Sequence, residues 1–480
     1  MRMFMRNGLV ALGFLSLFAF VYCAGKMSVS NEGALAYCAN QVRRSLQALD
    51  TVGYSQMPRN ILEGQTQWNT RRVCAEEWCS GFWPGVLWMT YEATGDTAIC
   101  HAAAHYTESL DSLAYQPAYD HDLGFIIINS FLKGIEALQH RPVATTVCNS
   151  DSLIAHYRSV ALAAADTLAT LFNPTVGTML SWPRHVKDYG GHNTIMDNMM
   201  NLELLFWAAE NGGKKSLRDI AIKHAETTML HHFRPDGSCY HVAVYDTLDG
   251  HFLRGVTHQG YSDSSMWSRG QSWAVNGYTM VYRFTHDDRF LQHAQKVTDI
   301  YIQRLLETNG CSELAKKWGK GIAPSLTGDE WSGADLIPRW DMDAPDEVKD
   351  ASAACVVASA LFELSDYVPE QKGALYRAFA EESLRQLSTH GYQSGERNVA
   401  FLMHSTGHHP AGSEIDASIV YADYYYIEAL LRQEKKNFNH ETYHLFTQYL
   451  PFAHPVCSFL LPVGLQDVWT LRDSGSRRTI

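Results

Sequence analysis

The sequence has little proline and no cysteine pattern that would define a small disulfide-bonded or zinc-binding fold. Only 15 of the 480 residues are proline, and because proline ends or kinks helices, long uninterrupted helices are expected. The ten cysteines follow neither a zinc spacing nor a disulfide framework, which predicts few disulfide bonds or none. No linker-like stretch divides the chain, so residues 26–480 are expected to form a single catalytic domain.

Positive charge is also scarce. The net charge of −12 argues against a nucleic-acid-binding protein, since such proteins are typically basic. The sequence lacks a phosphate-binding glycine loop, a nucleophile elbow and a dinucleotide fingerprint. His101 and His105 are four residues apart on a predicted helix, but no acidic residue follows at metalloprotease spacing. We therefore expect no metal, no organic cofactor and no nucleic-acid partner.

Residues 1–25 are typical of an export signal. Arg2 and Arg6 precede an apolar run over residues 8–22, which is short for a membrane span and is followed by small residues. Cys23 directly after the run is a candidate for lipidation, and the alternative is ordinary cleavage near Ala24. Either way we expect an exported protein, periplasmic or lipid-anchored, whose only membrane contact is a lipid on Cys23.

Hydrophobic residues recur at helical spacing in about twelve segments. Short strands are expected around 239–245 and 252–257, as a hairpin around Asp249 and Gly250. Residues 434–480 are expected to form a tail that wraps the body. The predicted helices cover residues 33–50, 80–95, 97–114, 122–139, 151–172, 197–211, 214–232, 264–284, 287–308, 350–365, 369–389 and 415–433.

The unusual residues gather at the beginnings of every second predicted helix. Helices joined by short turns alternate in direction, so every second helix points the same way. In a closed ring of six helical hairpins these beginnings surround one mouth. The pattern therefore predicts an all-α fold, an (α/α)6 barrel of six helical hairpins with its site at that mouth. The residues concerned are Trp78, Trp83, Asp122, Asp197, Trp267, Arg269, Trp273, Asp350, Ser413, Glu414 and Asp416.

Two aspartates turn this mouth into a candidate catalytic site. An aspartate before an apolar run is most often a helix cap, but Asp120 can cap the helix that follows Asp122, which leaves Asp122 free. A helix N-terminus stabilises the carboxylate of Asp197 and so lowers its pKa. A general acid needs the opposite shift, which we expect from the nearby Asp122 and from a dry pocket around Trp273.

Residues 258–274 contain the side chains that suit an acidic sugar. Trp267 and Trp273 offer flat faces for a sugar ring, and Arg269 offers a planar fork for a carboxylate. Each has an alternative: the tryptophans as core residues, and the arginine as one half of an ion pair. His241 and His258 are either structural histidines or ligands of a carboxylate.

With these residues assembled, the sequence resembles the unsaturated glucuronyl hydrolases of glycoside hydrolase family 88. The resemblance rests on residues 78–88, 121–125, 196–202, 258–273 and 404–410 with 421–425. It implies an (α/α)6 barrel in which Asp197 is the general acid and base and Asp122 is a second essential aspartate. It further implies that the sugar site is lined by Trp78, His241, Gln259, Trp267, Arg269 and Trp273.

The loop that contains His404, Ser405 and His408 falls where such enzymes contact the next sugar or its sulfate. A sulfate-binding version is expected to have serine and lysine there. This chain has Ser405 but histidine at 408 and 409, so its preference for sulfate stays open.

The resemblance implies a substrate that carries a Δ4,5-unsaturated uronic acid at its non-reducing end, as polysaccharide lyases leave it, with glycosaminoglycan disaccharides as the first expectation. Asp197 would protonate C4 of the double bond while Asp122 stays ionised, and water would attack C5. The resulting hemiketal opens and expels the remaining sugar. Three alternatives are an unsaturated rhamnogalacturonyl hydrolase acting on pectin fragments, an inverting glycosidase for saturated chains, and a non-catalytic sugar-binding protein. Linkage, sulfation, parent polysaccharide and oligomeric state stay open.

Overall fold

The computed structural model describes residues 29–145, 148–320, 331 and 333–449 of the chain. By internal contacts the described chain divides into two units after Gln433. Residues 1–25, predicted as an export signal, and residues 450–480 of the predicted tail lie outside the described part. None of the described helices is both long and apolar enough to cross a membrane.

Six helical segments form an inner ring. Neighbouring segments pack against one another: α3 contacts α6, α5 contacts α9, α9 contacts α11 and α11 contacts α14. Inner helices have no face in contact with water, so their sequences are apolar on nearly all sides. In α14, for example, thirteen of the fourteen residues are buried. The inner segments are α3 (Phe82–Thr94), α5 (Leu123–Ile127) continuing through the π-helical turn η3 (Ile128–Leu132) into α6 (Lys133–His140), α9 (Asn198–Glu210), α11 (Ser268–Thr285), α14 (Ala351–Leu364) and α16 (Val420–Tyr449).

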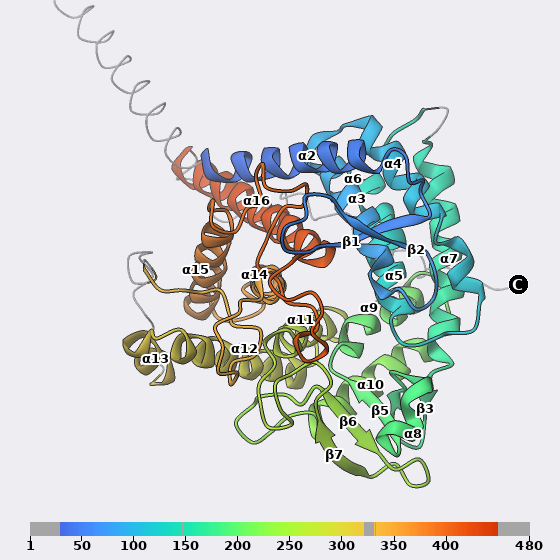
Figure 1. Cartoon of the computed structure of the whole chain (residues 1–480), viewed down its shortest axis with the longest axis vertical. Coiled ribbons are helices and arrows are strands. Elements are labelled where there is room, and N and C mark those ends of the chain that lie inside the picture. The colour runs from blue at the N-terminus through green and yellow to red at the C-terminus, as the bar shows by residue number, and fades with distance from the viewer. Residues whose placement is uncertain (1–28, 146–147, 321–330, 332, 450–480) are drawn as a thin grey trace, which may run out of the picture. The chain divides into compact units, whose positions relative to one another are not determined.

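Six outer helices cover this ring. In Figure 1, α7 lies outside α9, α12 outside α11 and α15 outside α14. They are amphipathic: α12 buries Phe290, Ala294, Val297 and Tyr301, which are three or four residues apart and so share one face. Most outer helices pair with the inner helix next to them in sequence. The outer helices are α2 (Val29–Leu49), α4 (Thr97–Glu108), α7 (Ser150–Ala169), α10 (Ser216–His231), α12 (Asp288–Thr308) and α15 (Glu370–Leu387).

Helix α16 closes the inner ring by contacting both α14 and α3. The hydroxyl of Ser359 in α14 donates a hydrogen bond of 2.6 Å to Glu428. On the other side the ring of Tyr424 packs edge-on against Phe82. A Cβ atom at Gly85 would collide with this same tyrosine ring and with the carbonyl of Asn129. Glycine is therefore required where α3 meets α16.

Short antiparallel strands lie between the helices. Strands β5 (His192–Ile195), β6 (Val242–Tyr245) and β7 (Phe252–Val256) form one sheet in that order. A second sheet has the order β2 (Asn69–Arg72), β1 (Gln56–Ile61) and β8 (Ser418–Ile419), and β3 (Phe172–Asn173) pairs with β4 (Thr178–Met179). These strands lead into the helix beginnings that carry the site.

The prediction of an all-α barrel of six helical hairpins is confirmed, and each of the twelve predicted helical segments contains an α-helix. The hairpin around Asp249 and Gly250 is also confirmed, by the pairing of β6 with β7. Most helix boundaries differ from the prediction by five residues or fewer, and two differ by more. The helix predicted over 97–114 ends at Glu108 and gives way to a 3-10 turn, and the last helix continues to Tyr449, into the segment predicted as a tail.

Candidate active site

A cavity of about 220 Å³ opens where the inner helices begin. Its walls come from the residues just before α3, α5, α9, α11 and α16. The residues predicted at one mouth are thus brought together in part, since six of the eleven line this cavity: Trp78, Asp122, Asp197, Arg269, Ser413 and Glu414. The lining residues are Arg59, Glu76, Trp78, Asp120, His121, Asp122, Trp182, Arg184, Ile195, Asp197, His258, Gln259, Arg269, Gly407, His408, Ser413, Glu414 and Tyr421.

Asp122 precedes α5 and directs its carboxylate into this cavity. The carboxylate of Asp120 accepts the backbone N–H of Asp122 at 3.0 Å, while Asp122 itself makes no capping hydrogen bond. The expectation that Asp120 would leave Asp122 free is confirmed. One oxygen of Asp122 lies 3.3 Å from Nε2 of His121, and Asp120 is paired with Arg184 at 2.9 Å.

Asp197 follows strand β5 at the beginning of α9, and it too makes no capping hydrogen bond. Its carboxylate lies 3.7 Å from Nε2 of His241. Burial raises the pKa of Asp197 to about 7, although the charge of Arg269 and the indole N–H of Trp273 act in the opposite direction. The pKa of this aspartate therefore suits a general acid near neutral pH. The expected dry pocket supplies the upward shift through burial, whereas the charge of Asp122 is not among its causes and the Trp273 N–H lowers the pKa.

Burial also raises the pKa of Asp122, and the nearby charges of Asp120 and Asp197 raise it further. Two carboxylates in one buried site resist being ionised together, so the pair tends to keep a proton. The expectation that Asp122 stays ionised disagrees with this environment. Its surroundings favour the protonated form.

Arg269 is one of the largest fully buried side chains, with 1% of its surface exposed. It forms an ion pair of 2.7 Å with Asp350 and donates hydrogen bonds to the carbonyl groups of Thr406 and Gly407. Arg269 is therefore ion-paired in the interior, not at the surface, and because it also lines the cavity its contact with the uronate stays a prediction. Arg269 holds the loop at 406–407 and brings positive charge near Asp197.

The predicted tryptophans separate into two groups. Trp78 lines the cavity and is partly exposed. Trp267 packs behind the lining, with its ring against His241 at 4.5 Å and under the guanidinium of Arg269. Trp273 is fully buried among Phe125 and Tyr425 and is not part of the lining.

The remaining predicted residues also divide. Gln259 and His408 line the cavity. His241 lies just behind it, where its Nδ1 accepts the backbone N–H groups of His258 and Gln259. His404 and Ser405 do not line it: His404 is paired with Asp416 at 2.6 Å, and Ser405 is fully buried in a backbone pairing with Ala417.

Several lining residues were missed in the sequence. Trp182 and Arg184 come from an irregular stretch, and Arg59 comes from strand β1. Arg59 binds Glu414 at 2.7 Å across 355 positions of the sequence, which no local pattern could reveal. His121 directly precedes the predicted Asp122. This adjacency was the only indication in the sequence that His121 belongs to the site.

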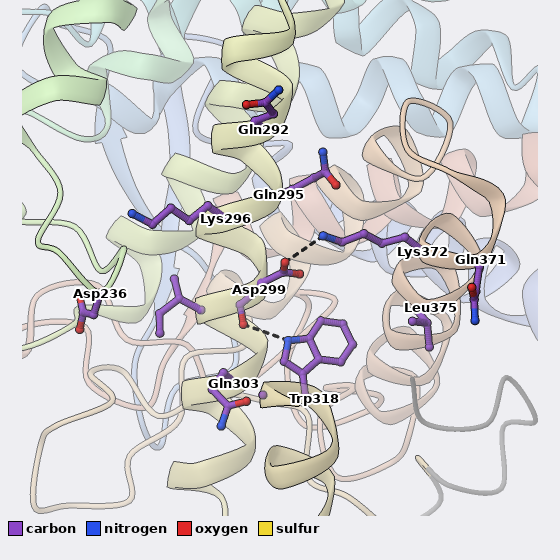
Figure 2. Close-up of a pocket in the computed structure, with 12 residues that line it drawn as sticks. Asp236, Gln292, Gln295, Lys296, Asp299, Gln303, Trp318, Gln371, Lys372 and Leu375 are labelled. Atoms are coloured by element: carbon purple, nitrogen blue, oxygen red, sulfur yellow. Dashed lines mark hydrogen bonds and ion pairs between the residues drawn. The ribbon is translucent and has the colours of Figure 1, made fainter. Parts of the chain in front are cut away.

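A larger cavity of about 840 Å³ lies on the outer face, among α12, α13 (Ser312–Gly319) and α15 (Figure 2). Its acidic side chain at Asp299 is already paired with Lys372 at 2.9 Å. The indole N–H of Trp318 donates a hydrogen bond to the backbone carbonyl of Asp299. None of the residues predicted for the site lines this cavity.

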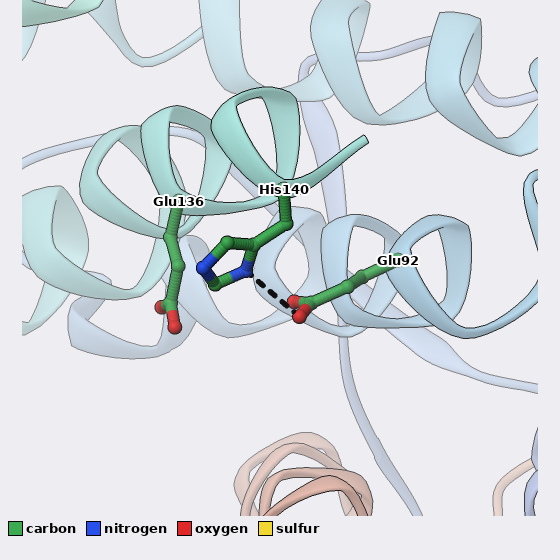
Figure 3. Close-up of side chains that lie close together, drawn as sticks. All are labelled: Glu92, Glu136 and His140. Atoms are coloured by element: carbon green, nitrogen blue, oxygen red, sulfur yellow. Dashed lines mark hydrogen bonds and ion pairs between the residues drawn. The ribbon is translucent and has the colours of Figure 1, made fainter. Parts of the chain in front are cut away.

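Within the described part of the chain, three groups of acidic and histidine side chains are close enough to hold a metal ion. In one of them, at the ends of α3 and α6, His140 is paired with Glu92 at 2.9 Å, while Glu136 lies 3.0 Å from Lys133 (Figure 3). Glu136 therefore already has a cationic partner in Lys133, and Glu92 is paired with His140 of the same group. A second group is Asp246, Asp249 and His251 on an exposed turn, and the third, Asp120–Asp122, belongs to the cavity described above.

Known proteins are similar to this chain in sequence and in fold. The chain is 36% identical over 390 residues to an unsaturated glucuronyl hydrolase from Formosa agariphila, covering 80% of this chain and 86% of that protein. It is 30% identical over 368 residues to an unsaturated chondroitin disaccharide hydrolase from Streptococcus pyogenes, covering 74% and 81%. The crystal structure of an unsaturated glucuronyl hydrolase specific for heparin matches with a TM-score of 0.69 and 34% identity, over 85% of this chain and 98% of that one. No family model matches the chain. Since the first of these relatives is covered over most of both lengths, the chain belongs to the unsaturated glucuronyl hydrolase family.

Proposed function

We propose that this protein removes the Δ4,5-unsaturated uronic acid from the non-reducing end of oligosaccharides left by polysaccharide lyases, with glycosaminoglycan disaccharides as substrates. The observation that carries the proposal is a pair of buried aspartates, Asp122 and Asp197, facing one cavity. The names of the relatives, which act on glucuronyl groups, a chondroitin disaccharide and heparin, support this class of substrate.

In the proposed reaction Asp197 transfers its proton to C4 of the C4=C5 double bond. Positive charge then develops at C5 and the ring oxygen, as in other oxocarbenium-like transition states. Water attacks C5 and gives its proton to Asp197, which is thereby restored. The product at C5 is a hemiketal, which opens and releases the remaining sugar. A pKa of about 7 suits both halves of this cycle, because the group must give and take a proton at similar pH.

The cavity offers an anionic sugar aromatic faces and polar groups. Trp78 and Trp182 supply the faces, and aromatic rings stack well on the apolar side of sugars. Gln259, His258 and His408 are polar side chains of the lining. Arg59 and Arg184 keep positive charge at the rim while they pair with acidic neighbours. We propose that these groups bind the uronate.

The first experiment compares unsaturated disaccharides from chondroitin, hyaluronan, heparin and pectin by loss of the ultraviolet absorbance of the double bond. We expect turnover of glycosaminoglycan disaccharides. Asp197→Asn should abolish turnover while disaccharide binding persists, since it keeps the shape of the side chain and removes the acid. Substantial turnover by this variant would show that another group carries the proton. Preferential turnover of the pectin disaccharide would favour a rhamnogalacturonyl hydrolase.

We also propose that the protein is exported, on the pattern of residues 1–25 alone. Labelling with a radioactive fatty acid in a bacterial host distinguishes the two forms. A lipoprotein incorporates label that Cys23→Ser abolishes, whereas a simply cleaved protein stays unlabelled and is found in the periplasmic fraction. Recovery of unprocessed chain in the cytoplasm would reject export.

A further inference from the structure

Two buried cysteines far from the cavity lie in contact. The sulfur atoms of Cys100, in α4, and Cys148, just before α7, are 3.1 Å apart. This is about 1 Å more than the length of a disulfide bond. Both side chains are fully buried. The contact therefore aligns two thiols that are 48 positions apart in the sequence.

The turn that carries Cys148 is held in place by its own hydrogen bonds. The hydroxyl of Thr145 accepts the backbone N–H of Cys148 at 2.9 Å, and the backbone N–H of Thr145 donates to the carbonyl of Cys148 at 2.8 Å. The side chain of Asn149 then caps α7. Either thiol can donate the hydrogen bond between the two sulfur atoms.

We propose that Cys100 and Cys148 form a disulfide bond when the protein folds in an oxidising compartment. The oxidant is a second disulfide, that of a thiol oxidoreductase or of glutathione disulfide. The thiolate of one cysteine attacks it, forms a mixed disulfide and releases one thiolate. The other cysteine then loses its proton and attacks the sulfur of the first, which releases the second thiolate. Two thiols are oxidised and one external disulfide is reduced. Because both sulfur atoms are buried in the folded chain, the exchange occurs during folding.

The test uses the full chain purified without reductant, unfolded in denaturant and alkylated. We expect peptides with Cys100 and Cys148 to be linked and unalkylated, and reduction before alkylation to release them. The oxidised protein should melt roughly 4 °C higher than the reduced protein, since the bond closes a long loop. Cys311→Ser, which removes a cysteine elsewhere, should keep this difference, and Cys100→Ser should lose it. Full alkylation of both cysteines in wild-type chain that was folded with glutathione disulfide and not reduced would overturn the proposal. This measurement needs no variant.

A separate observation concerns two histidines beside the catalytic aspartates. Burial lowers the pKa of both His121 and His241, so each is neutral and carries one ring N–H. Nδ1 of His121 lies 3.1 Å from the carbonyl oxygen of Ser181. A carbonyl only accepts, so this nitrogen holds the hydrogen, and Nε2 presents a lone pair to Asp122.

His241 has the opposite arrangement. Its Nδ1 accepts two backbone N–H groups, from His258 and Gln259, each at 3.1 Å. The hydrogen of the neutral ring must therefore be on Nε2, which points toward Asp197. At 3.7 Å this nitrogen makes no hydrogen bond to Asp197. A carboxyl group facing a lone pair gains a hydrogen bond when it is protonated, so the backbone around His121 favours the protonated form of Asp122 alone.

We infer that His121 is a positioning residue that keeps a proton on Asp122, so that an anionic sugar meets no charged carboxylate at Asp122 while Asp197 donates its own proton. This inference rests on the proposed function. Other groups act on Asp122 from several elements, two of them cations that favour its ionised form. They are Asp120 in the same loop, Asp197 before α9, Arg184 in the 3-10 turn η4 (Pro183–His185), Arg59 in β1 and Cys79 in the 3-10 turn η1 (Trp78–Gly81).

The test is His121→Asn, whose amide N–H can still donate to Ser181 but offers Asp122 no ring lone pair. The KM for the unsaturated disaccharide should rise about tenfold more than in wild type between about pH 5.5 and about pH 8, because Asp122 now ionises and repels the uronate. The kcat should change less. A structural role alone would lower activity equally at both pH values, and a KM that follows the wild-type pH dependence would overturn the inference.

A second measurement needs no folded His121 variant. The infrared difference spectrum of wild type minus Asp122→Asn at neutral pH should contain the C=O band of a protonated carboxyl group. Only a carboxylate band would overturn the inference. Failure of wild type to consume any unsaturated disaccharide would instead reject the proposed function, so the two failures are distinguishable.

Discussion

Arg269 allows a sharp test, because the sequence and the structure assign it different roles. If its guanidinium bound the uronate, as first expected, Arg269→Lys would mainly raise KM. In the structure the guanidinium makes hydrogen bonds to Asp350 and to the carbonyl groups of Thr406 and Gly407. Lysine keeps the charge but not the planar fork that reaches several acceptors at once. We therefore expect the variant to lose stability before it loses affinity.

The size of the effect follows from the acceptors that lysine leaves unpaired. One buried acceptor without a partner costs about 1–3 kcal/mol, and Arg269→Lys leaves one or two, so we expect a loss of about 2–4 kcal/mol. Arg269→Met also leaves the charge of Asp350 buried and unpaired, which costs about 3–5 kcal/mol. Since the charge of Arg269 lowers the pKa of Asp197, its removal should also shift the alkaline limit of activity to higher pH.

The assay is urea unfolding at fixed pH beside kcat and KM for the unsaturated disaccharide. Arg43→Lys is the control, because Arg43 forms an exposed ion pair with Asp96 and such pairs contribute about 1 kcal/mol or less. If Arg269→Lys unfolds at the same urea concentration as wild type and only its KM rises, then the buried hydrogen bonds of Arg269 do not stabilise the fold. The uronate-binding role would then be restored.

Three further predictions concern the ring and the cavity. Gly85→Ala should lower the melting temperature strongly, because its Cβ collides with Tyr424, whereas Gly33→Ala on α2, with open space around it, should be neutral or slightly stabilising; equal melting temperatures would contradict the closure at α16. The pKa of Glu428 is lowered to about 2 by Lys133 and by Arg432, so its stabilising effect is present above about pH 4.5 and is lost as the pH falls toward 2. It amounts to about 3 kcal/mol, and Glu428→Gln should flatten this part of the curve of stability against pH. Trp182→Ala should raise KM about tenfold with little effect on kcat if the ring stacks on the sugar; an unchanged KM would exclude that contact.

The helices and the mouth could be predicted because both depend on local signals. Apolar spacing marks each helix, and the chain reverses direction at each short turn, so the beginnings of alternate helices had to meet. The free carboxylate of Asp122 was also predictable, since Asp120 offered a second cap. Strand β5 was missed because its four buried residues, His192–Ile195, are too few for a period to be visible.

The protonation of the two aspartates depended on contacts that no local pattern contains. The lone pair facing Asp122 is fixed by the carbonyl of Ser181, sixty positions away. The N–H facing Asp197 is fixed by the backbone of His258 and Gln259. Sequence spacing indicated that two carboxylates and two histidines would gather, but the tautomer of each ring follows only from its backbone partner.

The tryptophans show why a helix beginning alone does not define a binding residue. Trp78 and Trp267 both lie where an inner helix starts, so the chain brings both backbones to the mouth. Arg59 and Tyr421 pack on Trp78, yet it remains part of the lining. Trp267 instead lies between Arg269 and His241, and the loop at 406–407 that this arginine holds lies in front of it. Local sequence places the Cα atom, whereas long-range packing decides whether the side chain meets substrate or supports the residue that does.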